Sequence, residues 1–265
     1  MTQRQLLQDC TEFLKNYYHD EIAEAALERR ESLWIDHNDL YTFDSDIAHD
    51  VIDGRPKEIL DALSAASANV DTPTSVTNSE LTIRLYNLPE TDVYAPGEIR
   101  AEQGGWYVGV DAILERVPST ADFPEEVAFE CQRCGNVIPV PQQITQDELQ
   151  EPTECDKCER KGPWQILDGE TNWQDYSKVR FQARPDANEA SEGKLPGYVL
   201  NDLIDEGGES GLIGRAGEPV TVYGIVKRSQ KSGRGENSLL FDHLLDVRAI
   251  EFDRDDDTVD VAAPR

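Results

Sequence analysis

The residues of this sequence best suited to chemistry are four cysteines arranged as two Cys-x-x-Cys pairs. Cys131 and Cys134 form the first pair, and Cys155 and Cys158 form the second after twenty intervening residues. A gap of two residues lets both thiolates of a pair bind one metal ion from a tight turn, and two such turns complete a tetrahedral site. The pattern therefore predicts one structural Zn²⁺ per chain. Four sulfur ligands leave no position for water, which argues against a catalytic zinc.

Basic residues are the second group of candidates, because positive charge is scarce in this chain. There are 25 lysines and arginines against 53 aspartates and glutamates, a net charge of −28. Between Pro219 and Gly235 there are nevertheless four basic residues and no acid, on a polar stretch between two strand-like segments. This arrangement predicts a β-hairpin tip that presents cations to nucleic acid, with a solvated turn as the simpler alternative. The four residues are Lys227, Arg228, Lys231 and Arg234.

A weaker basic group lies on strand-like segments around the cysteines. Lys178, Arg180 and Arg184 follow the second cysteine pair, and Arg116 ends a strand before the first. Cations combined with aromatic rings such as Phe181 are typical of single-strand binding, because charges follow the backbone and rings stack on bases. We therefore predict that all four basic residues contact DNA. The alternative for each of them is a surface ion pair.

The charge balance also indicates the solvent in which the chain works. The sequence contains only eight lysines among its 25 basic residues, and its pI is about 4.3. An acidic, lysine-poor surface suits concentrated salt, where a Debye length of roughly 3 Å at about 1 M screens self-repulsion. We expect a halophilic protein of a high-salt cytosol, with an ordinary acidic protein as the alternative.

Several classes of function are excluded by missing motifs. No apolar run approaches the roughly 18 residues of a membrane span, and no secretory leader is visible, so we expect neither a membrane protein nor disulfides. There is no G-x-x-x-x-G-K-[ST] phosphate loop, so the chain alone is expected neither to bind nor to hydrolyse ATP. The four histidines are not spaced as metal ligands.

The elements that position these candidates change type near residue 80. Apolar residues recur at helical spacing up to about residue 66, and a Ser/Thr/Pro-rich linker follows at residues 67–79. After residue 80 the apolar period becomes two, as in strands. The expected strands are residues 81–86, 106–110, 112–117, 127–130, 178–182, 197–200, 219–227 and 246–251.

These patterns predict a mixed α and β fold: an N-terminal helical bundle, then a five-stranded OB-fold barrel with an inserted zinc ribbon. We expect few contacts to cross between the bundle and the barrel. The predicted division is a helical subdomain at residues 1–80, the barrel with its basic hairpin at 81–129 and 169–252, the ribbon at 130–168, and an acidic tail at 253–265.

The order of these motifs resembles one family, the N-terminal domain of archaeal minichromosome maintenance (MCM) replicative DNA helicases. The resemblance depends on FLKNYY at residues 13–18, the two cysteine pairs, DYSKVRFQARPD at 175–186 and AGEPVTVYGI at 216–225. It covers nearly the whole chain. Asp111 departs from it, standing where a glycine is common.

The resemblance implies a function in DNA replication. It implies a hexameric ring, single or paired with a second ring, that encircles single- and double-stranded DNA. The basic hairpin would line the channel, Arg116 and Arg180 would bind single strands, and a C-terminal ATPase domain would complete the helicase. The place of action would be the cytoplasm, at the nucleoid. The alternatives are a free-standing zinc-ribbon OB-fold factor that binds single-stranded nucleic acid without a ring, and a scaffold that binds protein.

Overall fold

The helices of the first seventy residues follow the spacing of their apolar side chains. Helix α1 (Gln3–Tyr17) buries Leu6, Cys10, Phe13 and Leu14, which recur on one face. The computed structural model describes residues 2–71, 79–116, 120–145, 148–185, 192–204, 212, 215–230, 240–253 and 260–261. The remaining helices of this part are α2 (His19–Glu28), α3 (His37–Phe43), α4 (Ser45–His49), a π-helical turn (Asp50–Gly54) and α5 (Pro56–Ser67).

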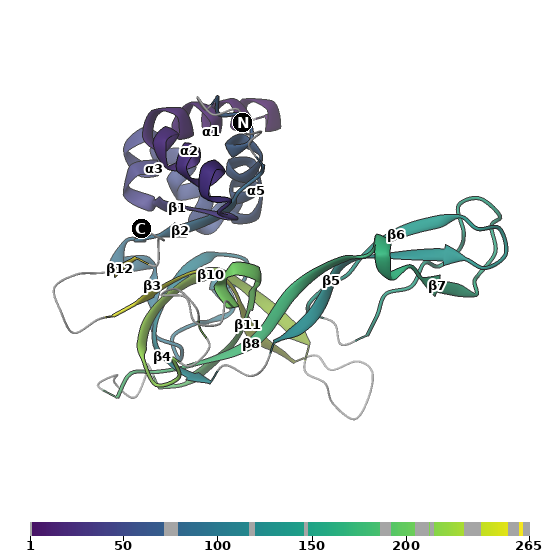
Figure 1. The fold of residues 1–265 in the computed structure, drawn as a ribbon. Coiled ribbons are helices and arrows are strands. Elements are labelled where there is room, and N and C mark those ends of the chain that lie inside the picture. Colours follow the sequence, from purple (N-terminus) through teal and green to yellow (C-terminus); the bar gives the residue numbers. More distant parts are fainter. Residues whose placement is uncertain are drawn as a thin grey trace.

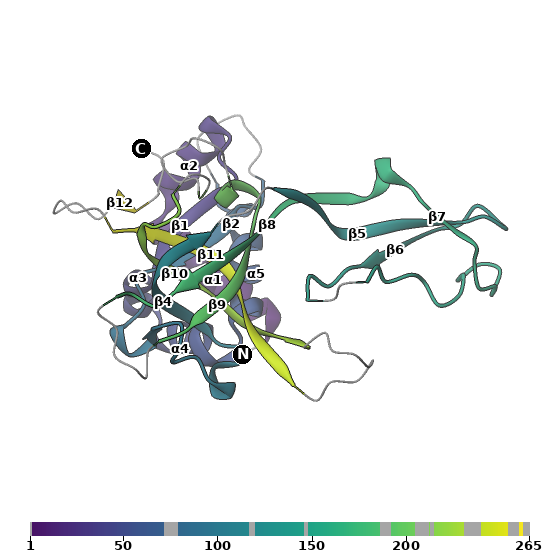
Figure 2. The same ribbon diagram turned by 90° about the horizontal axis from the view of Figure 1, so that it is seen from below.

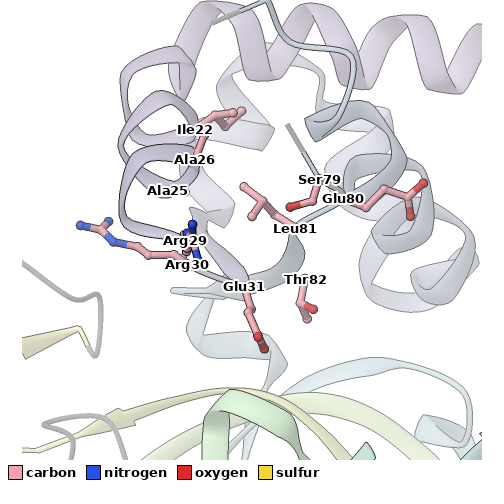
Figure 3. Close-up of a pocket in the computed structure, with 10 residues that line it drawn as sticks. All are labelled: Ile22, Ala25, Ala26, Arg29, Arg30, Glu31, Ser79, Glu80, Leu81 and Thr82. Atoms are coloured by element: carbon pink, nitrogen blue, oxygen red, sulfur yellow. The ribbon is translucent and has the colours of Figure 1, made fainter. Parts of the chain in front are cut away.

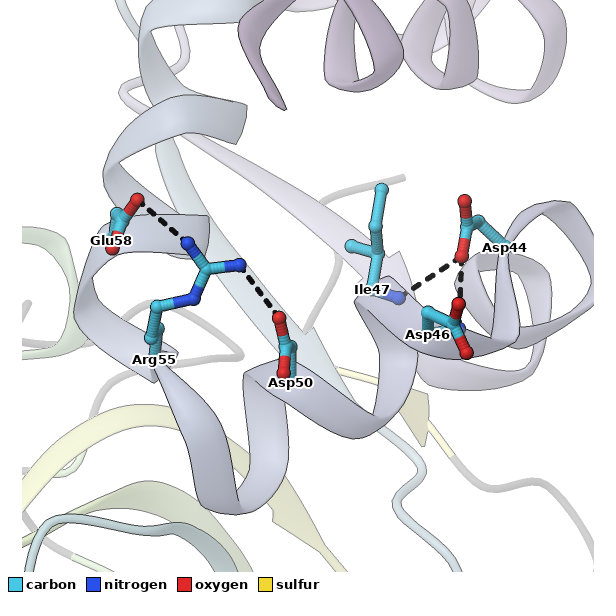
Figure 4. A network of polar contacts seen from close by, with 6 residues as sticks. All are labelled: Asp44, Asp46, Ile47, Asp50, Arg55 and Glu58. Carbon is cyan, nitrogen blue, oxygen red and sulfur yellow. Dashed lines mark hydrogen bonds and ion pairs between the residues drawn. The ribbon is translucent and has the colours of Figure 1, made fainter. Parts of the chain in front are cut away.

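Polar side chains set where the short helices begin and end. The Asp44 carboxylate accepts a hydrogen bond from the backbone N–H of Ile47 at 3.1 Å, which caps the start of α4 (Figure 4). Between the π-helical turn and α5, the Arg55 guanidinium bridges Asp50 at 2.7 Å and Glu58 at 3.1 Å. Helix α5 starts with a proline, whose missing N–H is unneeded in a first turn.

A two-stranded parallel sheet completes the helical part. Strand β1 (Ser32–Asp36) pairs with β2 (Thr82–Tyr86), so the strand that follows the linker returns to the helices. Leu81, Ile83 and Leu85 are buried in the core of the helices. This pairing favours a boundary after β2 over the predicted boundary at residue 80, which stays a prediction.

The second part of the chain is a β-sheet in which neighbouring strands are often not consecutive in the sequence. Its strands are β3 (Val93–Tyr94), β4 (Tyr107–Arg116), β5 (Ala121–Cys131), β6 (Val137–Pro141), β7 (Trp164–Ile166), β8 (Asn172–Gln182), β9 (Lys194–Leu200), β10 (Pro219–Gln230), β11 (Phe241–Phe252) and β12 (Asp260–Val261). Short 3₁₀ turns lie at Glu90–Asp92, Ala101–Gln103, Asp168–Glu170 and Asn201–Ile204. The two runs expected at residues 106–110 and 112–117 form the single strand β4.

Five of these strands close into a circuit, as the predicted OB-type barrel requires. The pairings run from β4 to β10, β11, β9 and β8, and β8 pairs with β4 again. Alternate side chains point inward and form one buried cluster. It includes Val110 of β4, Phe181 of β8, Val199 of β9, Val222 of β10 and Val247 of β11. The sequence prediction of helices followed by an OB-fold sheet is confirmed.

A long arm carries the cysteines away from the barrel. Strands β5 and β8 pair antiparallel along the arm, and β6 and β7 join β5 at its far end. Figures 1 and 2 show this arm extending sideways, while the helices pack on one side of the barrel. The cysteines are therefore held apart from both the helices and the barrel.

The helices and the barrel share a core, contrary to the expectation of few contacts. Tyr107, Ile225 and Ala249 of the barrel belong to the same buried cluster as the helices. The buried Tyr107 hydroxyl also donates a hydrogen bond to the Leu85 carbonyl of β2 at 2.6 Å. The expectation failed because Tyr223 and Ile225 of β10, which alternate with side chains of the barrel core, belong to the core of the helices.

Candidate functional site

The four cysteines of the two pairs meet at the end of the arm. Their Sγ atoms all lie within 4.8 Å of one another. The shortest separations are 3.8 Å between Cys131 and Cys158 and 3.6 Å between Cys134 and Cys155. Four sulfurs at about 2.3 Å from a central ion in a tetrahedron stand roughly 3.8 Å apart. The cluster could therefore hold a metal ion, and its donor set and geometry fit Zn²⁺.

The two cysteine pairs have the same backbone turn. The N–H of Gly135 donates to the Cys131 carbonyl, and the N–H of Glu159 donates to the Cys155 carbonyl, both at 2.8 Å. Both donors have a left-handed backbone, with φ of 68° and 56°. Glycine adopts this conformation without steric cost, whereas a glutamate does not. The repeated turn points both thiols of each pair at one centre.

The thiols differ in how readily they ionise without a metal. Burial disfavours the Cys155 thiolate, but backbone N–H groups of Cys158 and Lys157 and the neighbouring thiols lower its pKa to about 7. Burial and a hydrogen bond with Cys134 raise the pKa of Cys158 to about 12. One thiolate thus forms at the expense of its neighbours, as expected where four thiols share one site.

Lys178 and Arg180 share an exposed face of the barrel. They alternate on β8 with the buried Val179 and Phe181, so both point outward. The register pairs Lys178 with Tyr198 on β9, and Tyr198 with Asp246 on β11. Opposed residues of neighbouring strands lie on the same side of a sheet.

This exposed face extends across β9 and β11 to β10. Lys227 lies opposite Leu244 of β11, two residues from Asp246 and therefore on the same side of that strand. We call the outward side of β8, β9, β11 and β10 that carries Lys178, Arg180 and Lys227 the basic face.

A hollow of about 440 Å³ lies on the basic face. It brings Lys178 and Arg180 next to Ser229 and Leu244 at the base of the β10–β11 hairpin. Tyr176 also lines the hollow, and its ring lies between the rings of Phe123 and Tyr198. The centroids of Phe123 and Tyr176 are 6.0 Å apart, and those of Tyr176 and Tyr198 are 6.2 Å apart. Cations, rings and the hairpin base therefore meet on one surface.

Arg184 belongs to no such surface. Its guanidinium donates to Asp111 and to Asp253, each at 2.5 Å, and its side chain is 25% exposed. Two carboxylates from different elements thus neutralise it. The ion pair with Asp111 therefore depends on the residue at which the sequence departs from the pattern of the resembling family.

The hairpin residues Lys227 and Arg228 point to opposite sides. Lys227 Nζ lies 4.0 Å from the Asp246 carboxylate, and burial lowers its pKa. The Arg228 guanidinium donates to the Ala101 carbonyl at 2.7 Å and packs where a side chain on Gly104 would stand. The hairpin therefore does not present these two cations together.

The structure gives little on the three remaining residues that were predicted to contact DNA, which are Arg116, Lys231 and Arg234. Arg116 pairs with Arg180 through the backbone, which brings the ends of β4 and β8 together. Lys231 and Arg234 lie outside the described residues. Their predicted role stays a prediction.

Lys194 of the basic face and its partner Glu115 were not predicted as site residues. Lys194 starts β9 opposite Gln182, on the same face as Arg180, and donates to Glu115 of β4 at 2.6 Å. The same carboxylate lies 4.0 Å from Arg180 Nε. Lys194 is a lone lysine before an expected strand, and only its alternation with the buried Leu195 could have indicated an outward position.

A hollow of about 490 Å³ lies in the helical part, between α2 and the start of β2. Figure 3 shows Leu81 directed toward Ile22, while the Arg29 guanidinium points outward. Arg30 at its edge is ion-paired with Glu28. The residues that line this hollow include no nucleophile paired with a base.

Comparison with known proteins agrees with this geometry. Residues 97–230 match the MCM OB domain, and residues 4–87 match the MCM N-terminal domain. The minichromosome maintenance protein MCM of Saccharolobus solfataricus is 26% identical over 250 residues, covering 89% of this chain and 34% of that protein. DNA replication licensing factor MCM2 of Oryza sativa subsp. japonica is 28% identical over 212 residues, covering 77% of this chain and 21% of that protein.

A solved structure has the same fold. The crystal structure of the N-terminal domain of an archaeal MCM superposes with a TM-score of 0.73 at 22% identity, covering 96% of this chain and all of that one. The chain spans about a third of the Saccharolobus protein and a fifth of the rice protein. Within the described residues, no helix has the length and apolarity to span a membrane. From the two domain matches and the barrel geometry, we conclude that the chain belongs to the MCM family, of which it carries the N-terminal and OB domains.

Proposed function

We propose that this chain is the DNA-binding, ring-forming N-terminal part of an archaeal replicative DNA helicase. The observation that carries the proposal is the strand register, which places Lys178 and Arg180 on one outward face beside the hairpin base. Both side chains are exposed, and the basic face also carries the partly exposed ring of Tyr176, which packs against the buried ring of Tyr198. Cations would contact the phosphates of single- or double-stranded DNA, and the Tyr176 ring would stack on an exposed base.

The binding must be local, because a chain of net charge −28 repels DNA at long range. Each subunit offers a few phosphate contacts, and such contacts weaken steeply with salt. Six subunits around one strand would act at high effective concentration. A hexameric ring, single or paired with a second ring, therefore fits the sparse positive charge of one chain.

The cysteine cluster would hold one Zn²⁺ with a structural role. The proposed ligands are Cys131, Cys134, Cys155 and Cys158, whose four thiolates leave no position for a substrate. When bound, the ion supplies a cross-link between two distant turns. The arm end has only short strands to stabilise it, so the metal would fix its shape and support contacts between neighbouring chains.

The chemistry of unwinding would belong to another part of the helicase. We infer that an ATPase domain follows the OB domain in the whole protein, in the cytoplasm at the nucleoid, and that this chain alone does not bind ATP. The chain would guide DNA, and the motor would move it. A free-standing single-strand-binding factor would share the basic face but would lack the ring.

Fluorescence anisotropy with labelled oligonucleotides at low salt tests the DNA-binding proposal. We expect Lys178→Ala/Arg180→Ala to weaken binding at least tenfold for single strands of any sequence. The matched control is Arg4→Ala/Lys15→Ala, which removes the same charge from α1. Equal affinity of both double variants would refute the basic face as the DNA contact.

Light scattering tests the ring. A hexamer would have six times the 29.7 kDa chain mass. A monomer that binds DNA with unchanged strength would favour the free-standing factor.

A further inference from the structure

Glu115 is a carboxylate that lies beside two exposed cations of the basic face, Lys194 and Arg180. Its Oε1 accepts a hydrogen bond from Lys194 Nζ at 2.6 Å, and its Oε2 lies 4.0 Å from Arg180 Nε. The two cations come from neighbouring strands, β9 and β8, whereas Glu115 comes from β4. The carboxylate thus stands where one anion can contact two cations.

A strand irregularity puts Glu115 in this place. The register between β4 and β8 shifts between Leu114 and Arg116, so Glu115 is the extra residue of a bulge. Bulges redirect a side chain relative to the regular alternation of a strand. Because Leu114 is fully buried, regular pairing would leave its neighbour pointing straight outward. The bulge provides a position from which the side chain reaches Lys194.

Glu115 neutralises the two cations only in part. Its Oε2 is shielded from solvent but accepts no hydrogen bond within the described part of the chain. Lys194 and Arg180 keep 52% and 56% of their side-chain surface exposed. A phosphodiester approaching from solvent can therefore reach both cations without opening the barrel.

We propose that Lys194 is a further phosphate-binding residue of the basic face, and that Glu115 occupies the phosphate position until nucleic acid replaces it. This inference rests on the proposed DNA-binding function. In the free protein the carboxylate holds Lys194 and Arg180 in place. In the complex a phosphate takes over both cations, and Glu115 is left to the solvent and its counterions.

This exchange lowers the affinity and weakens its salt dependence. A phosphate that binds Lys194 must break an existing ion pair, and the released Glu115 takes up a cation from solution. That uptake offsets the counterion release that normally drives binding, about 0.7 per phosphate for single strands. Removing the carboxylate should therefore strengthen binding and steepen the salt dependence together.

The test measures affinity for a labelled oligothymidylate over a series of salt concentrations. We expect Glu115→Gln to bind about threefold to tenfold more tightly, with a slope of log K against log salt steeper by up to about 0.7. We expect Lys194→Gln to bind about threefold to tenfold more weakly, with a shallower slope. The gain from Glu115→Gln should shrink in the Lys194→Gln background, because the two residues act through one contact.

Matched controls remove the same charges elsewhere. Glu28→Gln and Lys15→Gln alter exposed side chains of α2 and α1, and long-range charge effects alone would make them equal to Glu115→Gln and Lys194→Gln. Circular dichroism and the unfolding midpoint show whether each variant folds. If Glu115→Gln folds but changes neither affinity nor slope more than Glu28→Gln does, the inference is overturned.

The result also separates this inference from the proposed function. If Lys178→Ala/Arg180→Ala weakens binding but Lys194→Gln does not, DNA binding stands and the role of Lys194 fails. If neither variant changes binding, the basic face itself is refuted. An increase for Glu115→Gln that persists undiminished in the Lys194→Gln background would assign the exchange to Arg180 and overturn the role of Lys194.

Discussion

One buried ion pair, Arg84 with Asp202, contributes to the contact between the helices and the barrel, and removing one partner should cost more stability than removing the other. Arg84 of β2 is 3% exposed, whereas the side chain of its partner, Asp202, is 29% exposed. Arg84 also donates to the Arg248 carbonyl of β11 at 2.7 Å. Burial lowers the pKa of Arg84, yet a guanidinium stays charged in proteins.

The loss of folding stability should therefore depend on which partner of the ion pair is removed. Asp202→Ala leaves a buried cation with only a carbonyl partner, which should destabilise the fold by about 3 kcal/mol. Arg84→Met keeps the apolar stem and leaves a carboxylate that water can solvate. Its main loss is the hydrogen bond to the Arg248 carbonyl, about 1 kcal/mol. The double variant should lie near Arg84→Met, because the unpaired buried charge is gone.

Urea unfolding of the full chain, followed by circular dichroism and tryptophan fluorescence, measures these differences. We expect the free energy of unfolding to fall in the order wild type, Arg84→Met, Asp202→Ala. The double variant should be more stable than Asp202→Ala alone. A larger loss for Arg84→Met than for Asp202→Ala, or strictly additive effects, would refute the reasoning.

Two further predictions concern the metal centre and a buried histidine. Elemental analysis should find one zinc per wild-type chain and almost none in Cys155→Ser, whose arm end should become protease-sensitive; clearly less than one zinc in the wild type would contradict this. His37 is 2% exposed, Nε2 donates to the Ala48 carbonyl at 3.2 Å, and burial lowers its pKa. The unfolded chain then binds the proton more readily, so stability is lost as pH falls below about 6.5 toward the lowered folded pKa. The stability advantage of the wild type over His37→Gln should accordingly shrink from pH 7.5 to 5.5 in urea unfolding, and a constant difference would contradict the assignment.

The sequence predicted the elements better than their partners. Helical and strand periodicity identified most elements, because burial of one face fixes that spacing. The partner of β2 could not be predicted in this way, since its pairing with β1 joins segments about fifty residues apart. The cysteine cluster was predictable because its spacing is local within each pair, and the tetrahedral geometry requires the pairs to meet.

Among the basic residues, the sequence could not separate free cations from paired ones. Lys178, Arg180 and Arg184 lie within seven residues of one another, yet only Arg184 is held between two carboxylates. Those carboxylates, Asp111 and Asp253, are 73 and 69 residues away. Whether a cation is available for DNA therefore depends on tertiary contacts that local composition does not contain.

Because the chain is so acidic, ion pairs within the fold decide which cations are available to bind DNA. Carboxylates outnumber cations by more than two to one, so a cation finds an intramolecular partner unless the fold keeps acids away. Lys178 is exposed, and among the described residues no carboxylate lies within ion-pair distance of it. Arg180 and Lys194 share one carboxylate, and Lys227 faces Asp246. The cations of the basic face thus differ in availability: Lys178 is free of ion pairs among the described residues, whereas Arg180, Lys194 and Lys227 have carboxylate partners. A polyanion must displace those carboxylates to contact any cation besides Lys178. Such a face favours a long phosphate chain over small anions, because only a polyanion gains enough contacts to offset each displaced carboxylate.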